Sequence, residues 1–319
     1  MKLVFVDYND PSVLTQIEPL AQAGVSAILA DLKNPTEDEV IEVCKSADIL
    51  VSSRVPLSRR ILASLPEVKM LCAPQVGFDH FDVTAARDLD LRIGHSAFCN
   101  YTEVASHALA LALILVRQIP IMQRHTATGG WDFTTAGALQ RPGTMTVGII
   151  GLGRIGGAFA MRAVPCFKRL IAYDPFRPAE DWPQNVERAE HLSDLLSHSD
   201  IVSLHTPLTD LTRGLVDAAF LSAMPQGSFL LNTARGEIAD PAAILDALES
   251  GHLAGAGLDV LPQEPPHPDD PVLTHPRIVV TPHSAFYSEQ SRQDKYAMVT
   301  ENVLSFIKTG APKYDALGL

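Results

Sequence analysis

Short apolar segments alternate with amphipathic segments over the first hundred residues. The apolar segments are rich in Val, Ile and Leu and predict strands near residues 3–7, 27–30, 49–52, 69–73 and 91–93. The periodicity between them predicts helices near residues 11–23, 36–46, 58–64 and 83–88. Because the strands are apolar on both faces, we expect a parallel sheet covered by helices on both sides. This pattern is typical of a small doubly wound α/β domain.

A long apolar helix is predicted next, from Tyr101 to about Ile119. The segment has no Gly or Pro before Pro120, which suits a helix end, and it is apolar almost all the way round, which predicts burial between domains or subunits. Residues 121–141 lose this periodicity and predict an extended arm. The longest apolar run, Ala108–Val116, has about half the length that a bilayer crossing needs. We therefore expect no membrane-spanning helix.

A second set of strands and helices begins at Thr146. Its apolar strands are TVGIIG, RLIAYD, DIVSLH, SFLLN, GAGLDV and RIVVTPH. Asp240 and Gly251 are suited to begin and end a helix between them, and a last helix is expected near residues 288–308. The Pro-rich segment 262–271 predicts a rigid loop. The chain thus predicts a second doubly wound domain of the Rossmann type.

Composition limits the classes of function. The 319 residues predict about two domains, and 37 acidic against 25 basic side chains give a net charge of −12. This charge argues against nucleic-acid binding and against binding to anionic membranes. An anionic substrate stays possible, because one local Arg can oppose the global charge. The N-terminus does not have the pattern of a signal peptide, and the cysteines have no paired spacing, so we expect a cytoplasmic protein with reduced thiols at Cys44, Cys72, Cys99 and Cys166.

A glycine-rich turn follows the first strand of the second domain. The sequence from Gly151 to Gly156 is GLGRIG, between an apolar strand and a predicted helix. In this context Gly151 allows the tight turn, Gly153 allows a pyrophosphate to approach the backbone, and Gly156 allows helix and strand to pack closely. The helix N-terminus then offers N–H groups to the phosphates. This arrangement predicts a dinucleotide site.

The next strand ends at Asp174, which lies 18 residues after Gly156. A carboxylate there accepts hydrogen bonds from ribose hydroxyls and repels a 2′-phosphate, which favours NAD over NADP. Arg177 tempers this preference, because a nearby guanidinium is able to bind a 2′-phosphate. The hypothesis is therefore NAD, with NADP as the weaker alternative.

Three polar residues follow strand ends in the second domain. They are Arg235, Glu264 and His283, and ligands bind beyond the carboxyl ends of strands in open parallel sheets. An imidazole can donate a proton as a ketone becomes an alcohol and remove it in reverse. A neighbouring carboxylate orients the imidazole, and a guanidinium can bind a substrate carboxylate. Together they predict hydride transfer at a carbon that bears oxygen.

Several stretches together resemble the D-isomer-specific 2-hydroxyacid dehydrogenase family. The matching stretches cover nearly all of the chain and include QVGFDHFDV, TEVASHALALALIL, VGIIGLGRIG, HSDIVSLHTPLT, LLNTARGEIAD, GAGLDVLPQEP and TPHSA. MPQGSFLLNTARG and PHSAFYSEQ are most similar to the branch of the C-terminal binding proteins and their bacterial enzyme relatives.

The resemblance implies a role for individual residues. Arg235 would bind the substrate carboxylate and carbonyl, His283 would be the acid and base, and Glu264 would hold it in place. The N–H groups of Val76 and Gly77 would bind the substrate carboxylate from the other domain. The cofactor contacts implied beyond the three glycines are Arg154, Ile155, Asp174, Pro207, Thr212, Thr233, Ala234 and Asp259, the last of these holding the nicotinamide carboxamide.

The resemblance also implies the domain organisation. Residues 1–98 and 288–319 would form the substrate domain, with a flavodoxin-like sheet, and residues 99–287 the dinucleotide-binding domain. Family members dimerise through the long helix and the following arm, so a homodimer through residues 101–141 is expected. Where many relatives have an Asn-x-Pro turn, this chain has His95-Ser96-Ala97, which leaves the role of His95 open.

The leading hypothesis is an NAD-dependent enzyme that interconverts a small 2-oxo acid, such as glyoxylate or hydroxypyruvate, and its D-2-hydroxy acid. A corepressor-like protein that senses nucleotides is the alternative from another class, and a phosphite-type dehydrogenase is a third. Arg54 has two interpretations: it binds a second anionic group of the substrate, or it is an exposed surface residue. No clustered metal ligands are present in the sequence, so we expect no catalytic metal.

Overall fold

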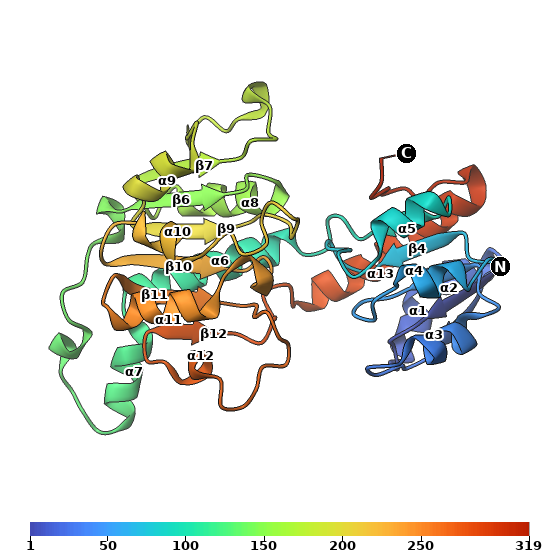
Figure 1. The fold of residues 1–319 in the computed structure, drawn as a ribbon, viewed down its shortest axis with the longest axis horizontal. Coiled ribbons are helices and arrows are strands. Elements are labelled where there is room, and N and C mark those ends of the chain that lie inside the picture. The colour runs from blue at the N-terminus through green and yellow to red at the C-terminus, as the bar shows by residue number, and fades with distance from the viewer. Residues whose placement is uncertain (319) are drawn as a thin grey trace. The chain divides into compact units, whose positions relative to one another are not determined.

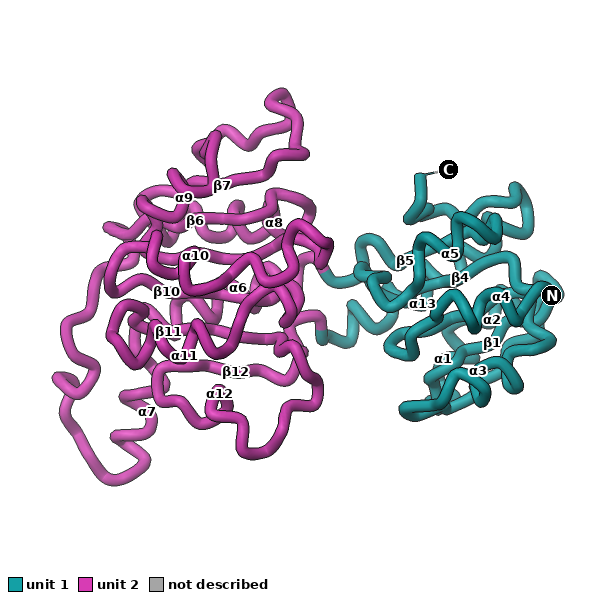
Figure 2. Tube along the Cα trace, in the orientation of Figure 1, with its two compact units in different colours: residues 1–100, 287–319 teal, residues 101–286 magenta. Residues whose placement is uncertain are grey.

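The computed structural model describes residues 1–318, which form two compact units (Figure 1). Unit 1 comprises Met1–Asn100 and Tyr287–Leu319, and unit 2 comprises Tyr101–Phe286 (Figure 2). Each unit has its own parallel sheet, of five strands in unit 1 and seven in unit 2. The predicted fold class, two doubly wound parallel-sheet domains, is confirmed.

The sheet of unit 1 has the strand order β2-β1-β3-β4-β5, the flavodoxin-like order. Its strands are β1 (Lys2–Phe5), β2 (Ser26–Leu29), β3 (Ile49–Val51), β4 (Met70–Ala73) and β5 (Arg92–His95). Its helices are α1 (Ser12–Gln16), α2 (Glu18–Gln22), α3 (Glu37–Cys44), α4 (Arg59–Ala63), α5 (Val83–Asp88) and α13 (Glu289–Thr309). The carboxyl ends of β1, β3 and β4 therefore lie side by side at one edge.

Alternate strand residues of unit 1 enter two separate cores. Val4, Leu50 and Leu71 pack with α3, α4 and α5 on one face of the sheet. Leu3 and Ile49 pack on the other face with α1, α2 and α13. The last long helix thus completes the domain that the N-terminal residues begin. Its N-terminus is capped by the Ser288 side chain, and it ends at Gly310, whose φ of +80° favours glycine.

The sheet of unit 2 has the order β12-β11-β10-β9-β6-β7-β8. Its strands are β6 (Thr146–Ile150), β7 (Arg169–Tyr173), β8 (Glu187–Arg188), β9 (Ile201–Leu204), β10 (Ser228–Asn232), β11 (Leu253–Leu258) and β12 (Ile278–Val280). Its α-helices are α6 (Tyr101–Val116), α7 (Ile119–Ala127), α8 (Arg154–Ala163), α9 (Leu192–His198), α10 (Ala218–Ser222), α11 (Pro241–Glu249) and α12 (Pro271–Thr274). Four 3₁₀ helices are η1 (Phe133–Ala136), η2 (Pro142–Thr144), η3 (Ala179–Asp181) and η4 (Gly236–Ile238). The order reverses between β6 and β9, where doubly wound folds bind ligands.

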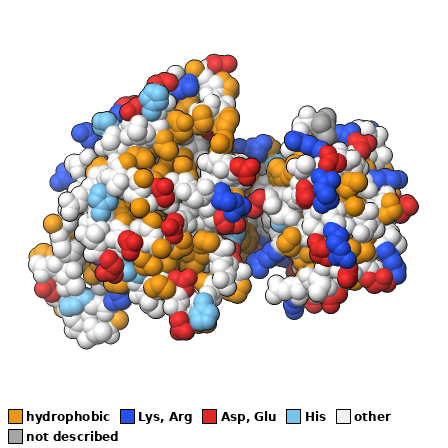
Figure 3. All heavy atoms as spheres, viewed as in Figure 1, with side chains coloured by type: hydrophobic (Ala, Val, Ile, Leu, Met, Phe, Trp, Pro, Cys, Tyr) orange, Lys and Arg blue, Asp and Glu red, His pale blue; other side chains and the backbone are white. Residues whose placement is uncertain are grey.

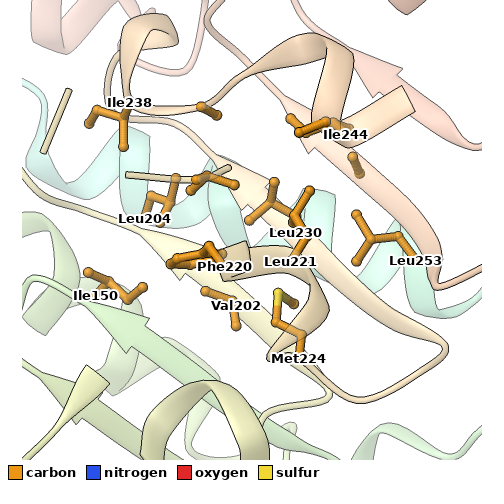
Figure 4. Packing of buried hydrophobic residues seen from close by; sticks show 14 of the residues in the cluster. Ile150, Val202, Leu204, Phe220, Leu221, Met224, Leu230, Ile238, Ile244 and Leu253 are labelled. Atoms are coloured by element: carbon orange, nitrogen blue, oxygen red, sulfur yellow. The ribbon is translucent and has the colours of Figure 1, made fainter. Parts of the chain in front are cut away.

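The sheet of unit 2 is buried on both faces. Val147, Ile149 and Leu231 pack against α6 and α8. Ile150 and Leu230 enter the opposite core, where side chains of β9, β10, α10 and α11 point toward one another (Figure 4). Burial of both faces explains why the strands are continuous apolar runs in the sequence.

Two helix predictions need correction. Pro120 does not end the long helix: α6 stops at Val116, and Pro120 lies in the first turn of α7, where a missing N–H costs nothing. The predicted helix 11–23 is two short helices, with Pro19 in the first turn of the second. The arm predicted at 121–141 is partly helical, since it contains the rest of α7 and η1.

Helix α6 belongs to the core of unit 2. Val104, Ala108, Leu111 and Leu115 are buried in that unit, whereas the sequence indicated burial between domains or subunits. Among residues 1–318 no single helix is long and apolar enough to cross a membrane, although α6 and α7 pass a test of length and composition as a pair bent by 64°.

Charged side chains of both signs are mixed on the surface in view, and the cysteines are unpaired. Acidic and basic side chains are interspersed over the face of unit 1 drawn in Figure 3. All four cysteines are free thiols; Cys44, Cys72 and Cys99 are buried and Cys166 is half-buried. Within residues 1–318 no three His, Cys, Asp or Glu side chains gather as metal ligands do.

Candidate active site

The glycine turn between β6 and α8 has the geometry that its sequence predicts. Gly151 has a φ of +87°, and a Cβ there would lie 2.7 Å from the carbonyl oxygen of His205. A Cβ at Gly156 would lie 2.1 Å from the carbonyl oxygen of Gly151, so glycine is required for α8 to approach the turn. Gly153, by contrast, faces open space. The N-terminus of α8, at Arg154 and Ile155, lies beside that space, and helix N-termini are suited to phosphate groups.

Asp174, at the end of β7, is tied to the glycine turn. One carboxylate oxygen accepts a hydrogen bond from the N–H of Leu152 at 2.8 Å, and the other accepts from Phe176 and Arg177. The Arg177 guanidinium donates to the carbonyl oxygens of Leu152 and Asp181. These bonds hold the guanidinium on backbone carbonyls and leave the carboxylate as the charged group beside the turn.

Buried hydroxyls at the ends of β9 and β10 fit a polar ligand. The hydroxyls of Thr206 and Thr233 are buried without a hydrogen-bond partner in the described chain. Each residue follows a strand at the carboxyl edge of the sheet, the edge where a dinucleotide binds. Unpaired buried hydroxyls cost free energy, so their presence here fits the ribose and nicotinamide groups of a bound NAD.

The other predicted cofactor residues lie in the loops after the same strands. The Thr212 hydroxyl donates to the carbonyl oxygen of Pro207 at 2.6 Å and accepts from the N–H of Thr209 at 2.8 Å, so it stabilises the loop after β9. The N–H of Ala234 donates to the Asn232 side chain at 3.0 Å. The loop after β9 and the loop after β10 therefore both lie beyond the carboxyl edge of the sheet. The Thr212 hydroxyl has its hydrogen-bond partners within its own loop.

His283 and Glu264 form a hydrogen-bonded pair. Nδ1 of His283 lies 2.6 Å from Oε2 of Glu264, and the other carboxylate oxygen accepts from the N–H of Leu261 at 3.0 Å. Burial acts to raise the pKa of Glu264, but the bonds from His283 and Leu261 and the charges of His283 and Arg235 outweigh it, so the pKa is lowered. The carboxylate is therefore ionised at neutral pH and orients the imidazole.

Arg235 reaches this pair through a close approach of two loops. It follows β10, and its Nη1 donates to the carbonyl oxygen of Ala234 at 2.8 Å. The next residue is Gly236, where a Cβ would lie 2.0 Å from the carbonyl carbon of Leu261. Only a glycine lets the Arg235 loop lie against the loop that contains Glu264. The charge of Arg235 acts on Glu264, so the structure brings together all three predicted catalytic side chains.

Asp259 supports the loop that contains His283. His283 has a φ of +50°, unusual for a residue with a side chain. Its N–H donates to the carbonyl oxygen of Asp259 at 2.8 Å, and the Asp259 carboxylate accepts from Ser284, Ala285 and the Thr281 hydroxyl. These four bonds stabilise the left-handed conformation. The sequence predicted a cofactor contact for Asp259, and the structure adds this positioning contact.

Two further residues in this network were missed in the sequence. The Thr281 hydroxyl donates to Asp259 at 2.6 Å, and Nε2 of His107 lies 2.9 Å from the same hydroxyl. His107 lies on α6. No spacing in the sequence relates residues 107, 259 and 281, because only the fold brings them together.

Val76 and Gly77 lie in unit 1, after β4. Both are half-buried, and neither N–H donates a hydrogen bond within residues 1–318. Nδ1 of His95 lies 2.8 Å from the carbonyl oxygen of Val76, so His95 supports this turn. Two adjacent N–H groups without partners are suited to a carboxylate.

Comparison with known proteins identifies the relatives of this chain. Residues 109–285 match the NAD binding domain of the D-isomer specific 2-hydroxyacid dehydrogenases. The chain is 34% identical to the glyoxylate reductase of Korarchaeum cryptofilum over 284 residues, which cover 87% of this chain and 85% of that protein. It is 32% identical to the D-3-phosphoglycerate dehydrogenase of Archaeoglobus fulgidus over 89% of this chain and 53% of that protein, so it spans about half the length of such relatives.

Solved structures agree with this result. The NAD-dependent formate dehydrogenase of Staphylococcus aureus, in complex with NAD, superposes with a TM-score of 0.87 at 28% identity, covering 99% of this chain and 98% of that one. The narrower resemblance to the C-terminal binding protein branch stays a prediction. On the match of its second unit and its similarity to these relatives, the chain belongs to the D-isomer-specific 2-hydroxyacid dehydrogenase family, with NAD as the cofactor.

Proposed function

We propose that this protein uses NAD(H) to interconvert a small 2-oxo acid, of the glyoxylate or hydroxypyruvate type, and its D-2-hydroxy acid. The observation that supports this function best is the 2.6 Å bond between His283 and Glu264, with the charge of Arg235 acting on the same carboxylate. An oriented imidazole and a cation are what reversible reduction of a carbonyl beside a carboxylate requires.

In this proposal His283 moves the proton. Its Nδ1 hydrogen is donated to Glu264, so Nε2 is the atom that donates a proton to the substrate oxygen during reduction and removes it during oxidation. Glu264 fixes the orientation of the ring through the bond to Nδ1. The cofactor supplies or accepts the hydride at the carbon that bears this oxygen.

Arg235 and unit 1 bind the substrate. The guanidinium is suited to a bidentate contact with the substrate carboxylate and to polarising the carbonyl. We assign the N–H groups of Val76 and Gly77 to the same carboxylate. In this proposal unit 1 is the substrate domain and unit 2 the dinucleotide-binding domain, and Asp259 contacts the nicotinamide carboxamide.

The preference for NAD over NADP rests on Asp174 and Arg177. The Asp174 carboxylate would repel a 2′-phosphate, and Arg177 is hydrogen-bonded to the carbonyls of Leu152 and Asp181. The cation that could bind a 2′-phosphate is therefore already engaged.

We also propose a homodimer through residues 101–141. Trp131 is 94% exposed and Phe133 is 85% exposed in the arm after α7. Large apolar side chains at this exposure are suited to a partner surface, here a second copy of the chain. A cytoplasmic location stays a prediction from the sequence.

The test is a panel of 2-oxo acids and phosphite, assayed with both nicotinamide cofactors. We expect reduction of glyoxylate or hydroxypyruvate with NADH, and loss of nearly all turnover in His283→Ala. Tight dinucleotide binding without turnover of any panel member would contradict the enzyme and favour the corepressor-like alternative. Oxidation of phosphite with no 2-oxo acid reduced would favour the phosphite-type dehydrogenase.

A further inference from the structure

The loop that contains His283 depends on a buried carboxylate. The Asp259 side chain is 1% exposed, and a buried carboxylate costs free energy unless its oxygens accept hydrogen bonds. Oδ1 accepts from the Thr281 hydroxyl at 2.6 Å and from the N–H of Ser284 at 2.9 Å, and Oδ2 accepts from the N–H of Ala285 at 3.0 Å. The residues on both sides of His283 are therefore bonded to one side chain.

Thr281 links this carboxylate to the backbone of His283. The N–H of His283 donates to the carbonyl oxygen of Asp259 at 2.8 Å and to that of Thr281 at 2.9 Å. The N–H of Thr281 donates to the carbonyl oxygen of Leu258 at 3.0 Å, so the residue after β12 is held against the end of β11. A change in the position of Thr281 would therefore reach His283, whose φ of +50° these bonds stabilise.

The direction of the hydrogen bonds assigns a proton to His107. The Thr281 hydroxyl has a single hydrogen, and at 2.6 Å from a carboxylate it donates that hydrogen to Oδ1 of Asp259. Nε2 of His107 lies 2.9 Å from the same hydroxyl oxygen, so it is the donor in that contact. Nε2 also lies 3.7 Å from Oδ1 of Asp259. The imidazole therefore has its proton on Nε2 and begins a chain of donors that ends at the carboxylate.

The packing of α6 on β11 determines where His107 lies. A Cβ at Gly255 would lie 3.2 Å from Cδ2 of Leu115. A Cβ at Gly257 would lie 3.2 Å from Cβ of Leu111. These two glycines let the helix lie directly on the strand. Four residues of a helix rise about 6 Å and two residues of a strand about 6.6 Å, so the next step along both elements brings His107 to the end of β11.

We propose that His107 is a positioning residue for the reaction: through Thr281 and Asp259 it holds the loop in which His283 donates and accepts the proton. This inference rests on the proposed function and adds a residue of α6 to those on which proton transfer depends. Packing alone would be satisfied by an apolar side chain of similar size. Positioning requires a hydrogen-bond donor at the place of Nε2.

Three variants separate these two roles. His107→Leu keeps an apolar side chain and removes the donor, His107→Gln keeps an N–H donor, and Thr281→Val removes the hydroxyl with little change in shape. In His107→Leu, kcat for 2-oxo acid reduction should fall about tenfold to a hundredfold, while KM for the acid changes less than threefold because its carboxylate is bound elsewhere. His107→Gln should stay within threefold of the wild-type kcat. Thr281→Val should show the same loss as His107→Leu, which keeps the test valid if His107→Leu does not fold.

A double variant tests whether His107 acts through Thr281. Residues that act in one hydrogen-bonded chain are not additive, so His107→Leu should lower kcat less than twofold further when Thr281→Val is already present.

His252→Leu is the matched control. His252 is also half-buried, and its Nε2 lies 2.8 Å from the carbonyl oxygen of Leu221. It precedes β11, at the opposite edge of the sheet from Asp259. His252→Leu removes a contact of the same kind and should leave kcat within twofold of wild type.

Nitrogen NMR of the cofactor-free protein gives a readout without turnover. With ¹⁵N-labelled histidine, the ring nitrogens are observed through their carbon-bound protons, and the signals of His107 are assigned by their loss in His107→Gln. We expect the neutral ring of His107 to have its proton on Nε2. The ring signals of His283, assigned by their loss in His283→Ala, should move in His107→Leu and keep their positions in His252→Leu.

The inference and the proposed function fail differently. A neutral His107 ring with its proton on Nδ1, wild-type kcat in His107→Leu, or equal losses in His107→Leu and His107→Gln would overturn the positioning role while leaving the reductase intact. Additive losses in the double variant would also overturn it. A wild-type protein that reduces no 2-oxo acid would refute the proposed function, and this inference with it.

Discussion

The glycines at the start of α8 allow cofactor binding and folding to be tested separately. Gly156 and Gly157 are adjacent on α8, yet a Cβ at Gly156 would lie 2.1 Å from the Gly151 carbonyl oxygen whereas a Cβ at Gly157 meets nothing within 4 Å. An ordinary contact is 3.4–4 Å, so Gly156→Ala must separate helix and turn by more than an ångström. Overpacking of this kind costs about 1–3 kcal/mol.

Gly157→Ala is the matched control. Alanine in a helix is about 0.5–1 kcal/mol more favourable than glycine, so this variant should melt at or above the wild-type temperature. Gly156→Ala should lower the melting temperature by about 2–12 °C, because 1 kcal/mol corresponds to about 2–4 °C in a unit of this size. Both variants are compared by thermal unfolding without cofactor and by calorimetric titration with NAD.

Gly153→Ala separates binding from stability. Its Cβ meets nothing within 4 Å in the cofactor-free protein, so unfolding should stay close to wild type. The added methyl group would occupy the space assigned to the pyrophosphate, so we expect at least a tenfold loss of NAD affinity. Wild-type NAD affinity in Gly153→Ala, or equal melting temperatures for Gly156→Ala and Gly157→Ala, would refute this account of the turn.

Four further predictions follow from single contacts. Burial lowers the pKa of His205 to about 3, so between pH 6.5 and 5 the unfolded chain binds a proton that the folded chain does not. Urea unfolding should therefore give a free energy of unfolding about 2 kcal/mol lower at pH 5 than at pH 6.5. This loss should be absent in His205→Gln, and equal losses in the two proteins would contradict the prediction. The lowered pKa keeps Glu264 ionised to a pH below its usual range, so the pair with His283 is intact at pH 7 and is lost only in more acidic solution. Glu264→Gln removes the carboxylate and should reduce kcat/KM at least tenfold at pH 7; unchanged turnover would exclude the role of the carboxylate. Asp174→Ala should move the ratio of NADPH to NADH use at least tenfold toward NADPH, and an unchanged ratio would remove the argument from repulsion. Trp131→Glu should halve the mass measured by light scattering if the arm forms a dimer, and a wild-type protein that is already a monomer would refute the arm's role.

The doubly wound fold could be predicted because its sequence pattern is local. Strands β6 and β10 are buried on both faces, so their sequences are continuous apolar runs. The break at Pro120 was misread because proline suits both the residue after one helix and the first turn of the next. Gln118 has a φ of +50° there, which nothing in the residue type indicated.

The candidate site could be predicted only in part. The common edge of the sheet brings together residues that follow strand ends, namely Gly151, Gly156, Arg235, Glu264 and His283. The contact of His107 with Thr281, by contrast, joins residues far apart in the chain. Such contacts are determined by packing, and no local spacing reports them.

The central claim is that His283 donates the proton while a hydride passes from the cofactor to a 2-oxo acid. It is tested most directly by supplying NADH deuterated at the transferable position and analysing the product by NMR and chiral chromatography. We predict deuterium at C2 of the D-2-hydroxy acid, with at least a thousandfold lower rate of formation in His283→Ala. An L product, a product without deuterium at C2, or wild-type formation by His283→Ala would contradict the account.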